Sequence, residues 1–131
     1  MFKRIDHVEL VTDQLERTIQ FYTDVLGFTV RSRDRVERSA AGVPLDIVYI
    51  ELGGTTVEVL TYEGANLDPA PEGIHLGYNL LALEVGDMQE TVRYLKSKGV
   101  ETVWGPVMRA NYARAEIADP SGYHIELRQW F

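Results

Sequence analysis

The stretch DHVELVTDQLERTIQFYTDVLGF, residues 6–28, decides the fold, because it opens a structural unit that the chain uses twice. Residues 7–12 alternate polar and apolar side chains, which is typical of a half-buried β-strand. A helical pattern follows, in which Asp13 is the expected N-cap, Glu16 completes a capping box and Gly27 ends the helix. Its apolar stripe, at helical spacing, consists of Leu15, Ile19, Tyr22 and Leu26.

Three further strands are expected in the first half of the chain, at residues 28–37, 45–52 and 55–62. The pair Gly53-Gly54 stands between the last two segments. Two glycines at that place predict a tight hairpin turn, because they adopt the left-handed backbone such turns require.

The second half of the chain repeats this order. Residues 80–85 (LLALEV) are a predicted strand, and Asp87 with Glu90 forms a second candidate capping box. Gly99 is the expected helix end. The helical stripe consists of Met88, Val92 and Leu95. Strands are expected at 100–109, 113–118 and 123–129, the last two joined by the turn DPSG at residues 119–122.

We therefore expect an α+β fold in which a single domain, residues 1–131, contains two βαβββ modules, at 4–62 and 78–131. Residues 63–77 are rich in Gly, Pro, Asn and Asp and form the predicted linker. The alternative is a ferredoxin-like α+β sandwich whose two halves are similar by accident. The matching caps, helix ends and final-strand glutamates favour the repeat.

Composition excludes several classes of protein. The chain has 13 Lys and Arg against 20 Asp and Glu, a net charge of −7, so we expect no nucleic-acid partner. The basic stretch 31–38 is interleaved with Asp34 and Glu37 and is interpreted as a solvated strand or hairpin. Without cysteine there is no disulfide, thiolate metal site or cysteine nucleophile. No apolar run approaches ~18 residues, so we expect no membrane span and take a cytoplasmic location as the default.

One glutamate stands in each final strand of the two modules, Glu58 in TVEVL and Glu126 in HIEL. Because side chains alternate across a strand, each glutamate faces away from its apolar neighbours, toward solvent or toward a shared site. His7 in the first strand can join the same face. One imidazole and two carboxylates suit a divalent ion such as Zn, Ni, Co, Mn or Fe, since two facing carboxylates repel unless a cation bridges them.

Three segments resemble the vicinal oxygen chelate superfamily: residues 6–28, GGTTVEVL at 53–60 and DPSGYHIEL at 119–127. This superfamily includes glyoxalase I, methylmalonyl-CoA epimerase, fosfomycin and bleomycin resistance proteins and extradiol dioxygenases. The resemblance covers nearly the whole chain. It implies that paired βαβββ modules form a curved mixed sheet around a cavity, with metal ligands from the first and fourth strands of each module.

Carried over position by position, the resemblance makes His7, Glu58 and Glu126 metal ligands. The fourth ligand position, a histidine in many relatives, holds Leu80 here. Three possibilities stay open. Water completes a three-ligand site, or a neighbouring residue replaces the ligand, or no functional metal binds. The candidate replacements are His75, Asn79 and His124, of which His124 is favoured because it shares the strand face of Glu126.

The resemblance implies a glyoxalase-like, metal-dependent lyase or isomerase that acts on a small oxygen-rich substrate through an enediolate. Glu126 is the first expected proton-transfer group, Glu58 the second and His124 an alternative base. We also expect a homodimer. One alternative function is a non-catalytic drug-binding protein of the bleomycin-resistance type. The residues expected to line its cavity are Tyr49, Tyr78, Trp104 and Tyr112. Another alternative function is an Fe(II) extradiol-type dioxygenase, which requires two histidines and one carboxylate.

Overall fold

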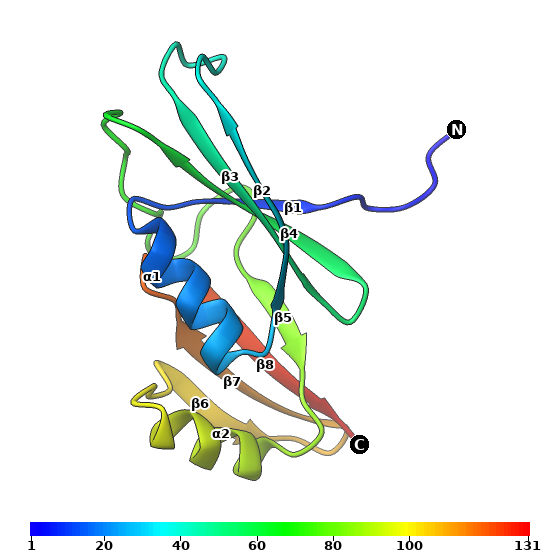
Figure 1. The fold of residues 1–131 in the computed structure, drawn as a ribbon. Coiled ribbons are helices and arrows are strands. Elements are labelled where there is room, and N and C mark those ends of the chain that lie inside the picture. The colour runs from blue at the N-terminus through cyan, green and yellow to red at the C-terminus, as the bar shows by residue number, and fades with distance from the viewer. The chain divides into compact units, whose positions relative to one another are not determined.

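The computed structural model describes residues 1–131 and divides into two compact units, Met1–Asp68 and Pro69–Phe131. The division falls within residues 63–77, the segment whose composition predicts a linker. Each unit has one strand, a helical segment and three further strands, and each holds one four-stranded mixed sheet (Figure 1). The predicted α+β fold with two βαβββ modules is confirmed.

The first unit contains one helical segment and one sheet, here called the first sheet. Its elements are β1 (Val8–Val11), α1 (Leu15–Gln20), the π-helical segment η1 (Phe21–Val25), β2 (Thr29–Val36), β3 (Leu45–Leu52) and β4 (Thr55–Tyr62). The strand order is β1-β4-β3-β2, with β1 parallel to β4 and the other pairs antiparallel. Gly53 and Gly54, at φ 56° and 80°, form the predicted turn between β3 and β4.

The start of α1 corrects the predicted cap. Asp13 does not cap the helix: the N-cap is Gln14, which makes no side-chain capping bond. The hydroxyl of Thr12 accepts a hydrogen bond from the N–H of Gln14 at 3.0 Å, so this threonine forms the turn before the helix and delays its start by one residue. Glu16 pairs with Arg33 at 2.6 Å.

The predicted helix 15–26 changes character midway. The N–H of Leu26 donates to the carbonyl of Phe21, five residues back, which is the spacing of a π-helix. The hydroxyl of Thr23 donates to the carbonyl of Ile19 at 2.9 Å, which competes with the backbone ladder and favours the wider turn. Gly27, at φ 82°, ends the segment as predicted.

The core of the first unit lies between the helical segment and one face of the first sheet. The sheet contributes Val48, Ile50, Val57 and Val59, and the helical side contributes Ile19, Tyr22 and Phe28, all at most 4% exposed. Because side chains alternate along β4, the valines that flank Glu58 face this core and the glutamate faces the opposite side. Packing of the valines therefore fixes the direction of Glu58.

The second unit repeats the arrangement with a regular α-helix, and its sheet is here called the second sheet. Its elements are β5 (Leu81–Glu84), α2 (Met88–Ser97), β6 (Trp104–Met108), β7 (Tyr112–Ala118) and β8 (His124–Trp130), with strand order β5-β8-β7-β6. Asp87 caps α2 as predicted, accepting a hydrogen bond from the N–H of Glu90 at 2.7 Å. Residues 100–103, predicted as strand, are not, because the N–H of Val100 bonds the carbonyl of Leu95 and completes the helix end.

The core of the second unit again takes one face of its sheet. Its fully or almost fully buried members are Met88, Leu95, Ala113, Ala115, Ile117, Ile125 and Leu127. The predicted turn 119–122 forms because the Asp119 carboxylate accepts hydrogen bonds from the N–H groups of Ser121 and Tyr123, each at 2.9 Å. Glu126, between two core residues of β8, faces the other side of the sheet.

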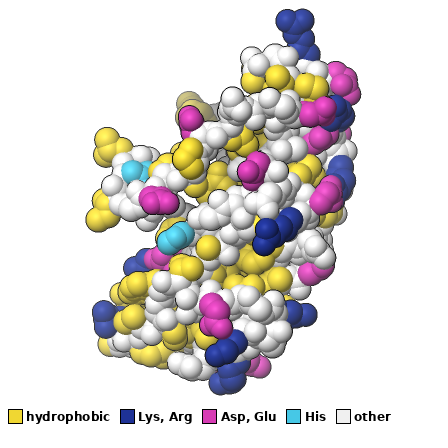
Figure 2. Space-filling model, turned by 90° about the vertical axis from the view of Figure 1, so that its left-hand side faces the viewer, with side chains coloured by type: hydrophobic (Ala, Val, Ile, Leu, Met, Phe, Trp, Pro, Cys, Tyr) yellow, Lys and Arg dark blue, Asp and Glu magenta, His cyan; other side chains and the backbone are white.

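The surface mixes charges of both signs. Strand β2 is exposed along its whole length, as expected for a solvated strand, and its Arg35 pairs with carboxylates of Glu37, Asp46 and Glu63. On the face shown in Figure 2, acidic and basic side chains are interspersed. Neither α1 nor α2 has the length and apolar character that a membrane-crossing helix needs.

Candidate functional site

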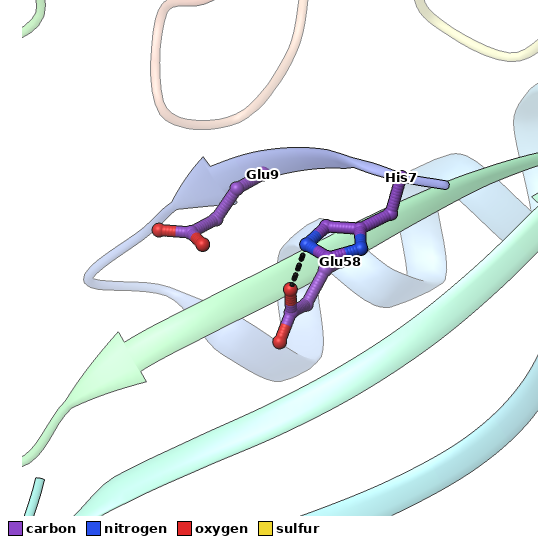
Figure 3. Close-up of side chains that lie close together, drawn as sticks. All are labelled: His7, Glu9 and Glu58. Carbon is purple, nitrogen blue, oxygen red and sulfur yellow. Dashed lines mark ion pairs between the residues drawn. The ribbon is translucent and has the colours of Figure 1, made fainter. Parts of the chain in front are cut away.

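Three potential metal ligands meet on the polar face of the first sheet. Glu9 of β1 and Glu58 of β4 are register partners, and His7 lies two residues before Glu9, so all three side chains project to one side (Figure 3). One ligand atom from each residue lies within 4.8 Å of the other two. We call these three residues the His7 cluster.

The imidazole of His7 is held from both sides. Its Nε2 lies 2.8 Å from Oε2 of Glu58, and its Nδ1 lies 3.0 Å from Oδ2 of Asp6. The hydrogen bond to Asp6 is the main reason that the pKa of His7 is raised above its ordinary value, with Glu58 contributing through its charge. The same bond lowers the pKa of Asp6, which also pairs with Arg4 at 2.9 Å.

Glu58 is buried, with 8% of its surface exposed, and Tyr49 of β3 is its cross-strand partner. The pKa of Tyr49 is raised chiefly because its hydroxyl donates a hydrogen bond to Glu58. The Tyr49 ring stands edge-on to His7, with ring centres 6.4 Å apart, and the guanidinium of Arg31 lies 5.1 Å from the same ring. Tyr49, predicted to line a cavity, therefore lies beside the His7 cluster.

The His7 cluster fits a divalent ion. Zinc–nitrogen and zinc–oxygen bonds are about 2.0–2.2 Å long, so ligand atoms on one ion lie roughly 3–4 Å apart, and small side-chain rotations reach that range. Two carboxylates balance a charge of +2, and one nitrogen with two oxygens suits borderline and hard divalent metals. An ion at Nε2 would replace the proton that Nε2 shares with Glu58, while the contact of Nδ1 with Asp6 would keep the ring oriented, as in many metal-bound histidines.

Glu126, the third predicted ligand, has a different environment. It is 7% exposed and lies on the polar face of the second sheet. Its Oε1 accepts from Arg128, at 2.7 Å from Nε and 2.5 Å from Nη2, and its Oε2 lies 2.7 Å from Nε of Arg114. The two guanidinium groups supply the positive charge that a metal ion would supply, so an ion at Glu126 would have to replace one of them.

His124 shares the face of Glu126 and belongs to the same network. Its Nδ1 lies 3.0 Å from Oε2 of Glu116, whose other oxygen pairs with Arg114 at 2.6 Å. The strand-parity argument for His124 thus agrees with the side-chain contacts. With Nδ1 protonated toward Glu116, its Nε2 is the open acceptor.

Strand register explains what the second sheet has in place of the His7 cluster. Glu9 pairs with Glu58 in the first sheet, and Ala82 pairs with Glu126 in the second. Leu80, two residues before Ala82, therefore takes the position that His7 has in the first unit. The second sheet lacks both of the additional ligands that the first sheet provides next to its glutamate.

Two of the candidate replacements lie in the segment before β5. Both ring nitrogens of His75 face carbonyl oxygens of their own segment, Nδ1 that of Gly73 at 2.9 Å and Nε2 that of Tyr78 at 3.0 Å. These bonds raise the pKa of His75. Asn79 is exposed, and the Tyr78 side chain, a predicted cavity residue, is fully exposed. None of the three forms a hydrogen bond or ion pair with Glu126, whose partners are Arg114 and Arg128.

Trp104 and Tyr112, the other predicted cavity residues, lie against the arginines of the second sheet. The guanidinium of Arg114 is 5.0 Å from the Trp104 ring, and that of Arg128 is 4.5 Å from the Tyr112 ring. Trp130 of β8 stands edge-on to Tyr112, with ring centres 6.0 Å apart.

Sequence reasoning missed Glu9 and the two arginines. The signal for Glu9 was present, because it stands two residues after His7 in a strand and must share its face. Arg114 and Arg128 also stand two residues from Glu116 and Glu126. Their pairing across β7 and β8 depends on the register, which the sequence does not state.

A fold of paired βαβββ units, with a histidine–carboxylate cluster on the polar face of one sheet, defines a recognisable class of protein. The family model described as the Glyoxalase/Bleomycin resistance protein/Dioxygenase superfamily matches residues 4–127. The chain belongs to this superfamily, as the resemblance implied.

Among curated relatives, a lactoylglutathione lyase of Arabidopsis thaliana is 29% identical over 97% of this chain and 44% of its own length. The chain thus spans about half the length of the plant relatives it matches. A lactoylglutathione lyase of Neisseria meningitidis is 28% identical over 96% of this chain and 90% of that protein.

Solved structures share the fold. A glyoxalase family protein from Bacillus cereus has a TM-score of 0.84 and 25% identity, covering 100% of this chain and 96% of the other. The trypanothione-dependent glyoxalase I of Leishmania major has a TM-score of 0.75 and 24% identity over 98% and 87% of the two chains. TnmS3, an antibiotic binding protein from Streptomyces, has a TM-score of 0.73 and 18% identity over 99% and 98%, so it shows similarity of fold alone.

Proposed function

We propose that the protein is a glyoxalase-type lyase or isomerase that depends on a divalent metal ion and moves a proton on a small oxygen-rich substrate through an enediolate. The observation that carries the proposal is the His7 cluster, where an imidazole and two carboxylates converge on one sheet face. The similarity to lactoylglutathione lyases supports this class of reaction.

In the proposed site, His7 and Glu58 bind the ion and Glu9 is the third ligand from the same unit. A divalent ion bound there would polarise adjacent substrate oxygens and make a neighbouring C–H group more acidic. Asp6 orients the imidazole through Nδ1, and the Tyr49 hydroxyl orients the Glu58 carboxylate by donating to it. These outer contacts keep the ligand atoms in place before an ion arrives.

Proton transfer is the second task of the proposed enzyme. Glu126 and then Glu58 stay the predicted groups for it, with His124 as an alternative base. The contacts of the second unit favour His124, because Glu116 orients its ring and leaves Nε2 as the acceptor, whereas guanidinium groups hold both oxygens of Glu126. The identity of the metal, a homodimeric assembly and a cytoplasmic location also stay predictions.

The first experiment titrates Zn²⁺, Ni²⁺, Co²⁺ and Mn²⁺ by calorimetry into chelator-stripped protein. We expect one site per chain, and Glu58→Gln should weaken binding at least tenfold, because a charged ligand is lost. Glu63→Gln is the matched control, since Glu63 pairs with Arg35 away from the cluster. Absence of binding, or binding that Glu58→Gln leaves unchanged, contradicts the proposed metal site.

The second experiment tests the reaction. Metal-loaded protein is given methylglyoxal and glutathione, and formation of lactoylglutathione is followed with time. Turnover that His7→Gln abolishes and Glu63→Gln retains supports a lyase. Metal binding without turnover, over a panel of hemithioacetals and 2-oxoacids, contradicts the enzymatic part of the proposal.

A non-catalytic small-molecule binding protein is the second candidate. It is favoured by Leu80 and Ala82, which leave the second sheet without additional ligands beside Glu126. Saturable ligand binding in metal-free protein, together with failure of both experiments above, would support this function in place of the lyase.

A further inference from the structure

We infer that the polar face of the second sheet binds a planar organic anion, a carboxylate carried by an aromatic or conjugated body. The site lies within one unit and shares no residue with the His7 cluster, and its arginines hold Glu126, a predicted proton-transfer group of the proposed enzyme. Its members, here called the arginine–aromatic cluster, are Arg114, Arg128, Trp104, Tyr112 and Trp130.

The register of β7 and β8 places two arginines side by side on this face, next to the cross-strand pair Glu116 and Glu126. Arg114 and Arg128 are direct cross-strand partners, and the next pair on the same face is Tyr112 with Trp130. Like charges that face each other directly across a sheet repel, so the pair needs compensating negative charge. The carboxylate of Glu126, in contact with both guanidinium groups, shows that a carboxylate is the group this pair accommodates.

The protein leaves part of each guanidinium unused. A guanidinium has five N–H donors. Arg128 uses Nε and Nη2 on Glu126, while Arg114 uses Nη2 on Glu116 and has an Nε that is buried without an aligned hydrogen bond. Neither Nη1 group has a hydrogen bond or ion pair within the protein. Because the two side chains are 32% and 23% exposed, a ligand can reach these donors, and a carboxylate takes them in parallel pairs.

Aromatic rings surround the two arginines and stay accessible. Arg128 lies 4.5 Å from the Tyr112 ring and 4.9 Å from the Trp130 ring, and Arg114 lies 5.0 Å from the Trp104 ring. These contacts hold the guanidinium planes in position. Trp104 is 44% exposed and Trp130 is 59% exposed, so both indoles offer surface on which a flat ligand stacks. An anion with a planar body therefore satisfies the donors and the rings together.

The chain contains its own reporter for this site. Trp104 and Trp130 are its two tryptophans, so tryptophan emission reports on the arginine–aromatic cluster. Metal-free full-length protein is titrated with benzoate, and separately with benzamide, which has nearly the same shape without the charge. We expect a saturable change in emission with benzoate and at least tenfold weaker binding of benzamide, since a charged acceptor makes the stronger bond to guanidinium.

The variant Arg128→Gln/Glu126→Gln removes a donor and its counter-ion together, so that no charge is left unpaired in the fold. We expect it to weaken benzoate binding at least tenfold. Arg93→Gln, on the exposed side of α2, is the matched control and should bind benzoate within twofold of the wild type.

A milder variant, Arg114→Lys, keeps the charge and removes the planar fork, and should also weaken benzoate binding several-fold. Circular dichroism establishes that each variant is folded. A linear response to benzoate, equal binding of benzamide, or unchanged binding in both arginine variants overturns the inference. Because no metal is present, these outcomes do not depend on whether the His7 cluster binds an ion.

Discussion

Replacing Arg128 tests how strongly the arginines of the second sheet hold the buried Glu126. Arg128→Gln removes two N–H donors from Oε1, at 2.7 and 2.5 Å, and leaves the carboxylate with Arg114 alone. A hydrogen bond to a charged group contributes about 1.5–3 kcal/mol. The Arg128 side chain is 23% exposed and therefore partly screened, so we expect the free energy of unfolding to fall by about 2 kcal/mol.

The partner variant isolates the interaction. Glu126→Gln removes the charge that separates two facing arginines and should cost about 1–2 kcal/mol. The double variant should cost less than the sum of the two, with a coupling of about 1–2 kcal/mol, because it leaves neither charge unpaired. Urea unfolding of metal-free protein, followed by far-ultraviolet circular dichroism, measures each free energy. Glu101→Gln, an exposed carboxylate of the same unit, is the control.

A coupling below about 0.3 kcal/mol would show that the contact contributes nothing measurable and refute the assignment of Glu126 as the counter-ion of these arginines. The Glu126→Gln variant also tests whether Glu126 is a metal ligand. If Glu126→Gln alone abolished metal binding, Glu126 would be a ligand and its arginine contacts would have to yield to the ion.

Three single contacts give further predictions. Asp6→Asn should lower the pKa of His7, measured by NMR in metal-free protein, and an unchanged pKa would contradict the role of Asp6. Because folding raises the pKa of His7, protonated His7 stabilises the fold fully below its unfolded pKa of about 6.5, and this stabilisation is lost as pH rises through the raised pKa. Asp6→Asn should therefore make the free energy of unfolding depend less on pH in that range. Gly105→Ala should lower the free energy of unfolding by about 3 kcal/mol, because at φ 75° the new Cβ would lie 2.8 Å from the backbone oxygen of Arg114. Gly122→Ala, with open space around its Cβ at φ 89°, should lower it by only about 1 kcal/mol. Equal losses of stability on thermal unfolding would contradict the clash at Gly105. Asp87→Ala should cost about 1 kcal/mol through loss of the α2 cap, and a loss of only a few tenths would argue against it.

The features that sequence predicts well depend on local periodicity. Strands β3 and β4 have the predicted bounds, and the direction of Glu58 follows from its two valine neighbours, because alternation needs no information beyond the strand itself. The N-cap at Asp87 is likewise a local feature, because its carboxylate accepts from the N–H of Glu90, only three residues along the chain.

The features that sequence missed depend on competition or on register. Asp13 and Asp87 have equivalent positions in the sequence pattern, and both are expected N-caps. In the structure the Thr12 hydroxyl accepts from the N–H of Gln14, the helix begins after Gln14, and Asp13 is therefore not the N-cap. The π-helical turn is favoured by a hydrogen bond of the Thr23 hydroxyl, which a pattern of apolar residues does not reveal. The contact of Glu126 with Arg114 joins two strands, and only their alignment brings the two residues together.

The environments of Glu58 and Glu126 show which sheet needs a cation. Both carboxylates are buried to nearly the same extent, with 8% and 7% exposed, and a buried charge requires compensation. Glu126 has two guanidinium groups, whereas Glu58 has an imidazole and a tyrosine hydroxyl and lies in no ion pair with Lys or Arg. The Glu126 charge is therefore balanced by two permanent cations, whereas Glu58, with Glu9 beside it, has a charged partner only when His7 is protonated. We accordingly expect a cation to bind at the first sheet, and the unused donors of the second sheet to bind an anion.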